Sequence, residues 1–278
     1  MSVSGIITLL TDFGLSDVYV GVMKGVLSQI NPHLTVIDLT HEIPPQNLMA
    51  ARFCLMNAYP YFPEGTVHIA VVDPGVGTER KAIALQFTNG YVVGPDNGLF
   101  GGLIKQYGVI TAVELTNHQY WRNSQPSTTF HGRDIFSPVA AYLASGVPIR
   151  DLGTVINSDT LIDLSIPDLE ITETSIKGSI QYIDRFGNLI TNIPGDMVAD
   201  KSWTVSFPEC TPSPNISSHR TYGEVELGHL LTLIGSHGWI EIAANGDSAK
   251  SRLQIDWGAT VQINYSRNAN FDNLVADN

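Results

Sequence analysis

Short apolar runs alternate with segments of helical periodicity along the first part of the chain. Ile6–Leu10, Thr35–Leu39 and Thr66–Val72 are short runs rich in β-branched residues, which is typical of buried strands. Val18–Ile30 and Leu48–Ala58 lie between these runs and repeat apolar residues at helical spacing. This alternation of strands and helices predicts an α/β domain with a parallel sheet.

A hairpin signal and two further helical segments follow. Ala82–Phe87 and Tyr91–Gly94 are apolar runs separated by Thr88-Asn89-Gly90, and Asn-Gly between two such runs is a strong signal for a β-hairpin. Gly98–Tyr107 and Ile135–Ser145 then have the spacing of short helices. We therefore expect the α/β domain to occupy residues 1–166.

The pattern changes near residue 160, where helical periodicity stops. Leu161–Glu170 is an acidic, loosely apolar stretch that contains proline and separates the two patterns. Beyond it lie short runs of strand length, broken by Gly, Pro, Asn and Ser: Ser175–Ile183, Leu189–Ile193, Thr204–Phe207, Leu230–Ile234, Trp239–Ala243 and Ala259–Tyr265. They predict an all-β second domain, a small barrel or sandwich, over residues 173–278.

The composition excludes several classes of partner. Of the 278 residues, 43% are apolar and 15% are charged, and this apolar content is sufficient to bury a core. The formal net charge of −12 disfavours nucleic acid and anionic membranes as partners. No apolar run reaches the roughly 18 residues of a membrane span. We therefore expect a small-molecule ligand, with no nucleic-acid or membrane partner.

The cysteines and the N-terminal residues indicate a compartment. Cys54 and Cys210 are far apart and belong to no C-x-x-C motif, which favours free thiols in a reducing environment. The first basic residue is Lys24, so the N-terminal stretch lacks the basic region of a signal peptide. We therefore expect a cytoplasmic protein.

Polar residues with catalytic potential follow several of the predicted strands. Asp12, Asp73 and Asp96 come just after apolar runs, and His131 and Asp134 precede a predicted helix. Each of them alone could simply close a turn or cap a helix. Because parallel strands deliver their carboxyl ends to one edge of a sheet, the set as a whole favours a ligand site there.

The glycine-rich segment Val71–Arg80 is not a nucleotide loop. It lacks both the Gly-Lys-Ser/Thr ending of a P-loop and the G-x-G-x-x-G fingerprint. Gly75 and Gly77 instead allow a tight turn that brings Asp73 and Arg80 back toward each other. The chain also lacks H-E-x-x-H and G-x-S-x-G, which disfavours a catalytic zinc and a serine nucleophile. We expect no metal site, with a metal-dependent hydrolase as an alternative supported only by scattered Asp and His residues.

Seven motifs, in order along both predicted domains, match one known family: Thr11-Asp-Phe-Gly14 with Asp17 and Tyr19-Val-Gly21, His41–Pro45, Val72–Arg80, Gly94–Gly98, Thr129–Asp134, Ile183–Asn192 and Gly235–Gly238. The chain resembles the S-adenosylmethionine (SAM) hydroxide adenosyltransferases, also called adenosine-forming SAM hydrolases, which are related to the SAM-dependent fluorinase and chlorinase. The resemblance implies a Rossmann-like α/β N-terminal domain, a smaller β-barrel C-terminal domain, and a homotrimer that binds SAM between subunits. SAM is then the substrate, and no cofactor is implied.

The resemblance also implies roles for individual residues. The family's catalytic set corresponds to Asp73, Arg80 and His131. Substrate contacts correspond to Asp12 at the ribose hydroxyls, Asp184 at the methionine amino group, Phe186 and Asn188 at the adenine, and Ser236, Glu241, Ala243 and Asn245 in the C-terminal part of the pocket. The implied reaction is hydrolysis of SAM to adenosine and L-methionine, by in-line attack of an activated water or hydroxide on the ribose C5′.

Two other functions fit the same resemblance less well. A SAM-dependent halogenase is disfavoured, because the halogenating relatives differ at the positions of Asp73 and His131, where the fluorinase has tyrosines. A SAM- or adenosine-binding sensor without turnover is disfavoured, because binding alone needs no group that activates a nucleophile. Which of Asp73 and His131 accepts the proton of the water stays open at this point.

Overall fold

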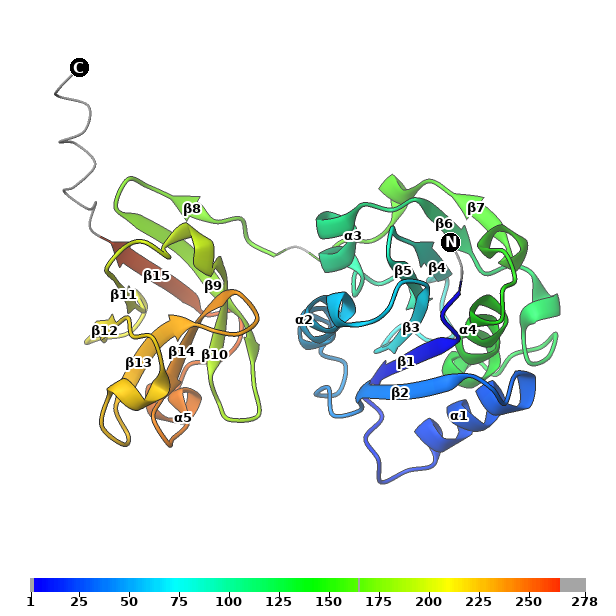
Figure 1. The fold of residues 1–278 in the computed structure, drawn as a ribbon, viewed down its shortest axis with the longest axis horizontal. Helices are drawn as coiled ribbons and strands as arrows, with labels where there is room; N and C mark the ends of the chain where they lie inside the picture. The colour runs from blue at the N-terminus through cyan, green and yellow to red at the C-terminus, as the bar shows by residue number, and fades with distance from the viewer. Residues whose placement is uncertain (1–2, 165, 266–278) are drawn as a thin grey trace, which may run out of the picture. The chain divides into compact units, whose positions relative to one another are not determined.

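The computed structural model describes residues 3–164 and 166–265, and the chain divides into two compact units, Met1–Ser165 and Ile166–Asn278 (Figure 1). Residues 266–278, which the sequence analysis includes in the second domain, lie outside the described residues. Within the described ranges, none of the helices combines the length and the hydropathy needed to cross a lipid bilayer.

The N-terminal unit is a mixed sheet of seven strands in the order β2-β1-β3-β5-β4-β6-β7, covered by helices. Its strands and α-helices are, in chain order, β1 (Ile6–Thr11), α1 (Tyr19–Ile30), β2 (Thr35–Thr40), α2 (Leu48–Ala58), β3 (Thr66–Val71), β4 (Ala82–Gln86), β5 (Gly90–Pro95), α3 (Gly101–Tyr107), β6 (Thr111–Glu114), α4 (Ser137–Ala144) and β7 (Thr154–Ile156). Strands β2, β1, β3 and β5 run parallel to one another, whereas β4 pairs antiparallel with β5 and β6, and β7 pairs antiparallel with β6. The α/β class predicted from the sequence is confirmed, and the sheet is mixed rather than wholly parallel.

The central strands of this sheet are buried on both faces. Every residue of β3 and of β5 is buried, and helix α1 packs against α4 while α2 packs against α3. Such cover on both faces explains why these strands are continuous apolar runs in the sequence. Since β1 and β3 are parallel neighbours, the residues that follow them, Asp12 and Asp73, leave the sheet at the same edge.

The C-terminal unit is an antiparallel barrel that is nearly closed. Its elements are β8 (Glu170–Ile171), β9 (Ser175–Ile183), β10 (Leu189–Pro194), β11 (Trp203–Ser206), β12 (Ile216–Ser217), β13 (Leu230–Ile234), β14 (Trp239–Ala244), α5 (Ala249–Leu253) and β15 (Thr260–Tyr265). The strand order is β12-β11-β15-β9-β10-β14-β13, with β8 also paired to β9. A bridge between Ser218 and Thr232, and a 2.8 Å hydrogen bond from the His219 N–H to the Thr232 carbonyl, join the two outer strands. Of the two architectures that the sequence leaves open, the unit is therefore the barrel.

Strand β14 illustrates how the barrel sorts its side chains. Ile240, Ile242 and Ala244 belong to the main hydrophobic core, as the period of two along a strand requires. Ala243 instead packs in a separate small cluster with Leu231 and Leu233. The two faces of this strand therefore have different surroundings, which decides which of its residues can reach a ligand.

Burial of His68 makes the stability of the N-terminal unit depend on pH. His68 lies on β3, is 1% exposed, and its Nδ1 is 2.8 Å from the Thr8 Oγ1. Burial lowers the pKa of His68 to about 3. Below pH ~6.5 this histidine is protonated in the unfolded chain but stays neutral in the folded chain. The free energy of unfolding therefore falls as the pH drops from 6.5 toward 3.

Replacing His68 removes this pH dependence. Between pH 7 and pH 5 the wild-type protein should lose about 2 kcal/mol more free energy of unfolding than the His68→Asn variant. Asn has no titratable group and keeps a polar atom for Thr8. Equilibrium urea unfolding of both proteins at the two pH values measures this difference, and equal losses would contradict the assignment.

Candidate active site

Two tight turns after β3 bring Arg80 back to Asp73. The Val76 N–H bonds the Asp73 carbonyl at 3.2 Å, and the Thr78 N–H bonds the Gly75 carbonyl at 3.1 Å. Gly77 has a φ of 77°, and a Cβ at this position would collide with the backbone carbonyl of Thr128. Glycine is therefore needed at this position for its conformation and for its lack of a side chain. The turn expected from Gly75 and Gly77 is the one that forms.

Asp73 and Arg80 form a buried ion pair with fork geometry. The Arg80 Nε donates to both carboxylate oxygens of Asp73, at 2.9 and 3.0 Å, and the Arg80 Nη2 donates to the Oδ2. Only 8% of the Arg80 side chain and 5% of the Asp73 side chain are exposed. Charge-assisted bonds of this kind hold both groups in one orientation.

His131 completes the cluster, and its partner determines its tautomer. The Arg80 Nη2 lies 2.8 Å from the His131 Nδ1. A guanidinium group only donates hydrogen bonds, so the Nδ1 is the acceptor and the proton of the neutral ring is on the Nε2. Burial and, after it, the charge of Arg80 lower the pKa of His131, while the carboxylates of Asp73 and Asp134 oppose this change. The ring is therefore neutral near pH 7.

A one-turn π-helix positions His131. The π-helix Gly132–Phe136 begins directly after His131 and leads into α4. Asp134 is fully buried and accepts two 2.7 Å bonds from Arg133 and a 2.8 Å bond from the Ser127 N–H. These bonds fix the loop that carries His131. π-Helical turns are rare and often occur at functional sites.

Other polar residues singled out in the sequence have structural roles. The Asp96 Oδ1 accepts a 2.9 Å bond from the Ile162 N–H, and Asp96 is 5% exposed. Asn97 donates through its Nδ2 to the Val72 carbonyl at 2.8 Å, which supports the backbone just before Asp73. Asp96 therefore stays outside the cluster.

Among the described residues, no group of three or more His, Cys, Asp or Glu side chains is arranged to hold a metal ion.

A cavity of about 250 Å³ joins this cluster to Asp12. Asp12, Asp73 and His131 line it, together with Phe13, Gln46, Val71, Pro74, Val76, Thr129, Phe130 and Gly132. The Asp12 Oδ2 accepts a 2.8 Å hydrogen bond from the Gln46 N–H. Four residues expected at the site, Asp12, Asp73, Arg80 and His131, are thus brought together at or directly behind one cavity.

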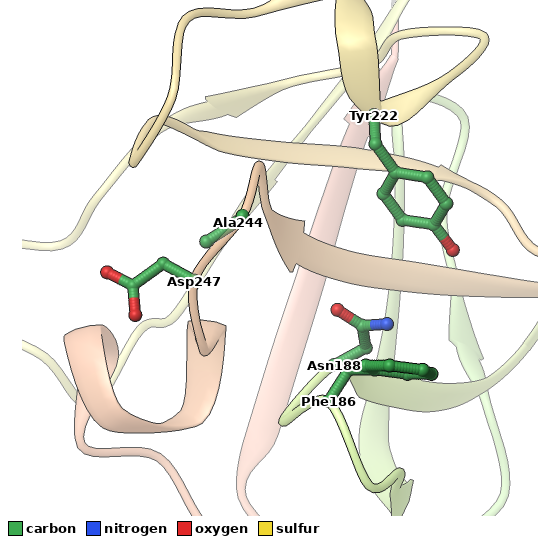
Figure 2. Close-up of a pocket in the computed structure, with 6 residues that line it drawn as sticks. Phe186, Asn188, Tyr222, Ala244 and Asp247 are labelled. Carbon is green, nitrogen blue, oxygen red and sulfur yellow. The ribbon is translucent and has the colours of Figure 1, made fainter.

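The C-terminal unit has a larger cavity of its own, of about 520 Å³. Phe186, Asn188, Tyr222, Ala244, Gly246 and Asp247 line it. Figure 2 shows the Tyr222 ring on one side of this pocket and Phe186 and Asn188 on the other. Phe186 is 77% exposed, which leaves its ring available to a ligand in this cavity.

Asp184 holds the turn that presents these two side chains. Its Oδ1 accepts 2.9 Å bonds from the N–H groups of Phe186 and Asn188, and its Oδ2 accepts a 2.9 Å bond from the Asn188 Nδ2. Asn188 is 7% exposed and lines the cavity. Asp184 therefore orients Asn188 whether or not it also contacts a ligand.

The four residues expected in the C-terminal part of the pocket are placed unevenly. Glu241 is 3% exposed and accepts bonds from the Tyr222 hydroxyl at 2.8 Å and from the His237 Nε2 at 3.2 Å. Asn245 donates to the Val225 carbonyl at 2.7 Å. Ser236 is exposed in the turn between β13 and β14, and Ala243 is fully buried. The cavity is lined by the neighbouring Ala244 rather than by any of these four.

Sequence reasoning missed several residues that line the cavities. Tyr222 lies in a loop that belongs to none of the seven motifs, so no signal in the sequence pointed to it. Gln46 directly follows the motif His41–Pro45 and could have been found by extending that motif by one position. Burial and the hydrogen bond to Glu241 raise the pKa of Tyr222, so its hydroxyl keeps its proton and remains a donor.

The structure thus defines a two-domain protein, an α/β unit followed by a β-barrel, with an acid–base cluster beside a cavity of the α/β unit. Family comparisons extend over both units. The SAM hydroxide adenosyltransferase N-terminal domain matches residues 7–153, and the SAM hydroxide adenosyltransferase C-terminal domain matches residues 178–262. The chain belongs to the SAM hydroxide adenosyltransferase family.

Individual relatives resemble the chain over nearly its full length. It is 39% identical to an (R)-S-adenosyl-L-methionine hydrolase of Salinispora tropica, with 92% of this chain and 97% of the relative covered. It is 40% identical to the protein of the same name from Thermus thermophilus, with 91% and 97% covered. A crystal structure of an uncharacterized conserved protein from Thermotoga maritima superposes with a TM-score of 0.87 at 37% identity, covering 92% of this chain and 99% of that one. A fluorinase of an Actinoplanes species is more distant, at 28% identity over 68% of this chain and 71% of its own length.

The bond between Arg80 and His131 has a spectroscopic consequence. In the free protein His131 should titrate with a pKa below 6.5, and its neutral ring should carry the proton on the Nε2. Two-dimensional ¹⁵N NMR of the imidazole nitrogens distinguishes the two tautomers and follows the titration, with His131→Asn identifying the signals. A neutral ring protonated on the Nδ1 would exclude the bond from Arg80.

Proposed function

We propose that the protein hydrolyses SAM to adenosine and L-methionine. The observation that carries this proposal is the contact of Asp73, Arg80 and His131 beside a cavity that Asp12 also lines. Relatives that are named (R)-S-adenosyl-L-methionine hydrolases share 36–40% of their residues with this chain. The substrate therefore includes the (R) epimer at the sulfonium centre.

The reaction makes few demands on the protein. The sulfur of SAM is a sulfonium, so methionine leaves with the C5′–S electron pair and needs no general acid. A water oxygen forms the new bond to C5′ from the side opposite the sulfur. The protein must hold this water about 3–3.5 Å from the carbon, in line with the breaking bond, and must take up one proton.

The tautomer of His131 determines the role of each of the three residues in the reaction. With its proton on the Nε2, neutral His131 can donate a hydrogen bond but cannot accept one at that nitrogen, so it orients the water oxygen. Asp73 then accepts the proton. Once the C–O bond forms, the attacking oxygen is a strongly acidic oxonium, so even a weakly basic, ion-paired carboxylate suffices. Arg80 donates hydrogen bonds to both Asp73 and His131 and holds them in place.

Substrate binding uses residues of both units. Asp12 accepts hydrogen bonds from the ribose hydroxyls, the exposed ring of Phe186 stacks on the adenine, and Asn188 bonds its edge. Asp184 contacts the methionine amino group through the acceptor capacity of its Oδ2. For Ser236, Glu241, Ala243 and Asn245 we propose contacts in the C-terminal part of the pocket, where Glu241 acts through Tyr222 and Ala243 through its backbone.

The two sets of binding residues belong to a homotrimer in which the N-terminal unit of one subunit and the C-terminal unit of its neighbour share one SAM. Asp12, Asp73 and His131 line a cavity of the N-terminal unit, Phe186 and Asn188 line a cavity of the C-terminal unit, and SAM has an adenine, a ribose and an amino acid to cover. The domain limits 1–166 and 173–278 and a cytoplasmic location complete the proposal.

A single assay separates the proposed function from its alternatives. Purified protein is incubated with (R)-SAM and with (S)-SAM, with and without chloride, and with EDTA. We expect adenosine and methionine from the (R) epimer, at a rate that neither chloride nor EDTA changes. A 5′-halogenated deoxyadenosine would establish a halogenase instead, loss of activity with EDTA a metal-dependent hydrolase, and binding without product a sensor.

Replacement of Asp73 tests its role as the proton acceptor. Asp73→Asn should lower kcat about 10²–10⁴-fold, because the amide keeps the size of the side chain but cannot accept the proton. The dissociation constant for SAM, measured by calorimetry, should stay within about threefold of wild type. Weaker binding with an unchanged kcat would move Asp73 from the chemistry to substrate binding.

Mixed trimers test whether the site is shared between subunits. Asp73→Asn and Asn188→Ala should each be nearly inactive alone when assayed below KM. Co-expressed in equal amounts, they should recover about a quarter of wild-type activity, because each shared site draws its two halves at random. A site contained within one chain would give no recovery in the mixture, since no chain would be intact.

A further inference from the structure

Two residues other than glycine adopt a left-handed backbone conformation among the described residues. Gln46 has a φ of 62° and Gln254 a φ of 54°, whereas all the other positive φ values belong to glycines. This conformation brings the Cβ of an L-residue close to the following carbonyl oxygen and is uncommon outside glycine. Each of the two glutamines therefore needs a reason.

Gln254 has a structural reason and Gln46 does not. Gln254 is the C-cap of α5, and helices commonly end on a residue in this conformation. Gln46 lies just before Asn47, the N-cap of α2, and the start of a helix does not require a residue in the left-handed conformation. The side chain of Gln46 is exposed, so it contributes little to packing. Glycine or asparagine would adopt the same backbone with less strain, so the glutamine side chain itself calls for an explanation.

The surroundings of Gln46 indicate what its side chain is for. Its backbone N–H donates to the Asp12 Oδ2 at 2.8 Å, and the residue lines the cavity of Asp73 and His131. A carboxylate such as Asp12 can only accept hydrogen bonds, whereas a primary amide can donate and accept. A ribose hydroxyl that donates to Asp12 keeps lone pairs that an amide N–H can satisfy.

We propose that Gln46 determines specificity for the sugar, its side-chain amide binding a ribose hydroxyl beside Asp12; this rests on the proposed SAM hydrolysis. The strained backbone turns the N–H of Gln46 toward Asp12 and leaves its side chain at the cavity. Gln46 thus supports the hydroxyl-binding carboxylate through its backbone and contacts the substrate through its amide.

Variants at Gln46 and Gln254 form a matched pair. Gln46→Gly suits the backbone but lacks the amide, and it should lower kcat/KM for SAM about tenfold, as expected for the loss of one hydrogen bond. Gln254→Gly makes the same change outside both cavities and should leave kcat/KM unchanged. Both variants should keep a Tm within about 4 °C of wild type. Gln46→Asn, which tolerates this backbone but has a shorter amide, should also lose activity.

Deoxy substrates distinguish a sugar contact from a general effect. Wild type and Gln46→Gly are compared on SAM, 2′-deoxy-SAM and 3′-deoxy-SAM. For one of the two analogues, the ratio of its kcat/KM to that of SAM should rise about tenfold in the variant, because the contact is already lost. Unchanged ratios for both analogues, or wild-type activity in Gln46→Gly, would overturn the inference while leaving the hydrolase intact. A wild-type protein that does not turn over SAM would overturn the proposed function itself.

Discussion

The arrangement of the candidate site depends on the buried ion pair between Asp73 and Arg80. It closes the loop that follows β3 and places one guanidinium nitrogen against His131. Removing one partner would leave an uncompensated buried charge, which typically costs roughly 3–5 kcal/mol. The bond from Arg80 also fixes which nitrogen of His131 is protonated, because a guanidinium group can only donate. The same ion pair thus determines both the conformation of the loop and the protonation of His131.

Much of the fold could be predicted because its longer helices and strands have clear signals in their own local sequence. Helix α2 begins and ends at the predicted residues Leu48 and Ala58, and the Asn-Gly hairpin forms between β4 and β5 as expected. The short strands β6, β7, β8 and β12 were missed. Strands β7, β8 and β12 have only two or three residues, which carry no period, so these strands exist only through their partners. The π-helix Gly132–Phe136 was also missed, since its apolar spacing does not differ visibly from that of an α-helix.

Some residues of the candidate site could likewise be predicted from the sequence, and others could not. Asp12 and Asp73 could be found because strand ends converge at one edge, and His131 because it belongs to a family motif before a helix; the folded chain gathers all three at one cavity. Ala243 and Ala244 could not be told apart, since the pleat of β14 alone decides which of them lines the barrel's cavity. Tyr222 reaches its cavity from a loop whose path depends on tertiary contacts. Conspicuous residues are therefore predictable at strand ends and much less so in loops.

The cluster of Asp73, Arg80 and His131 is electrically neutral near pH 7. One negative and one positive charge cancel within a single pair, and the lowered pKa of His131 keeps its ring uncharged. An anion entering this cavity would lose hydration without gaining an ion pair, because Asp73 already neutralises Arg80, and this loss is costly in a partly buried site. A water molecule is neutral, so its desolvation costs much less. The balance of charge therefore disfavours an anion such as chloride in this cavity relative to a neutral molecule such as water.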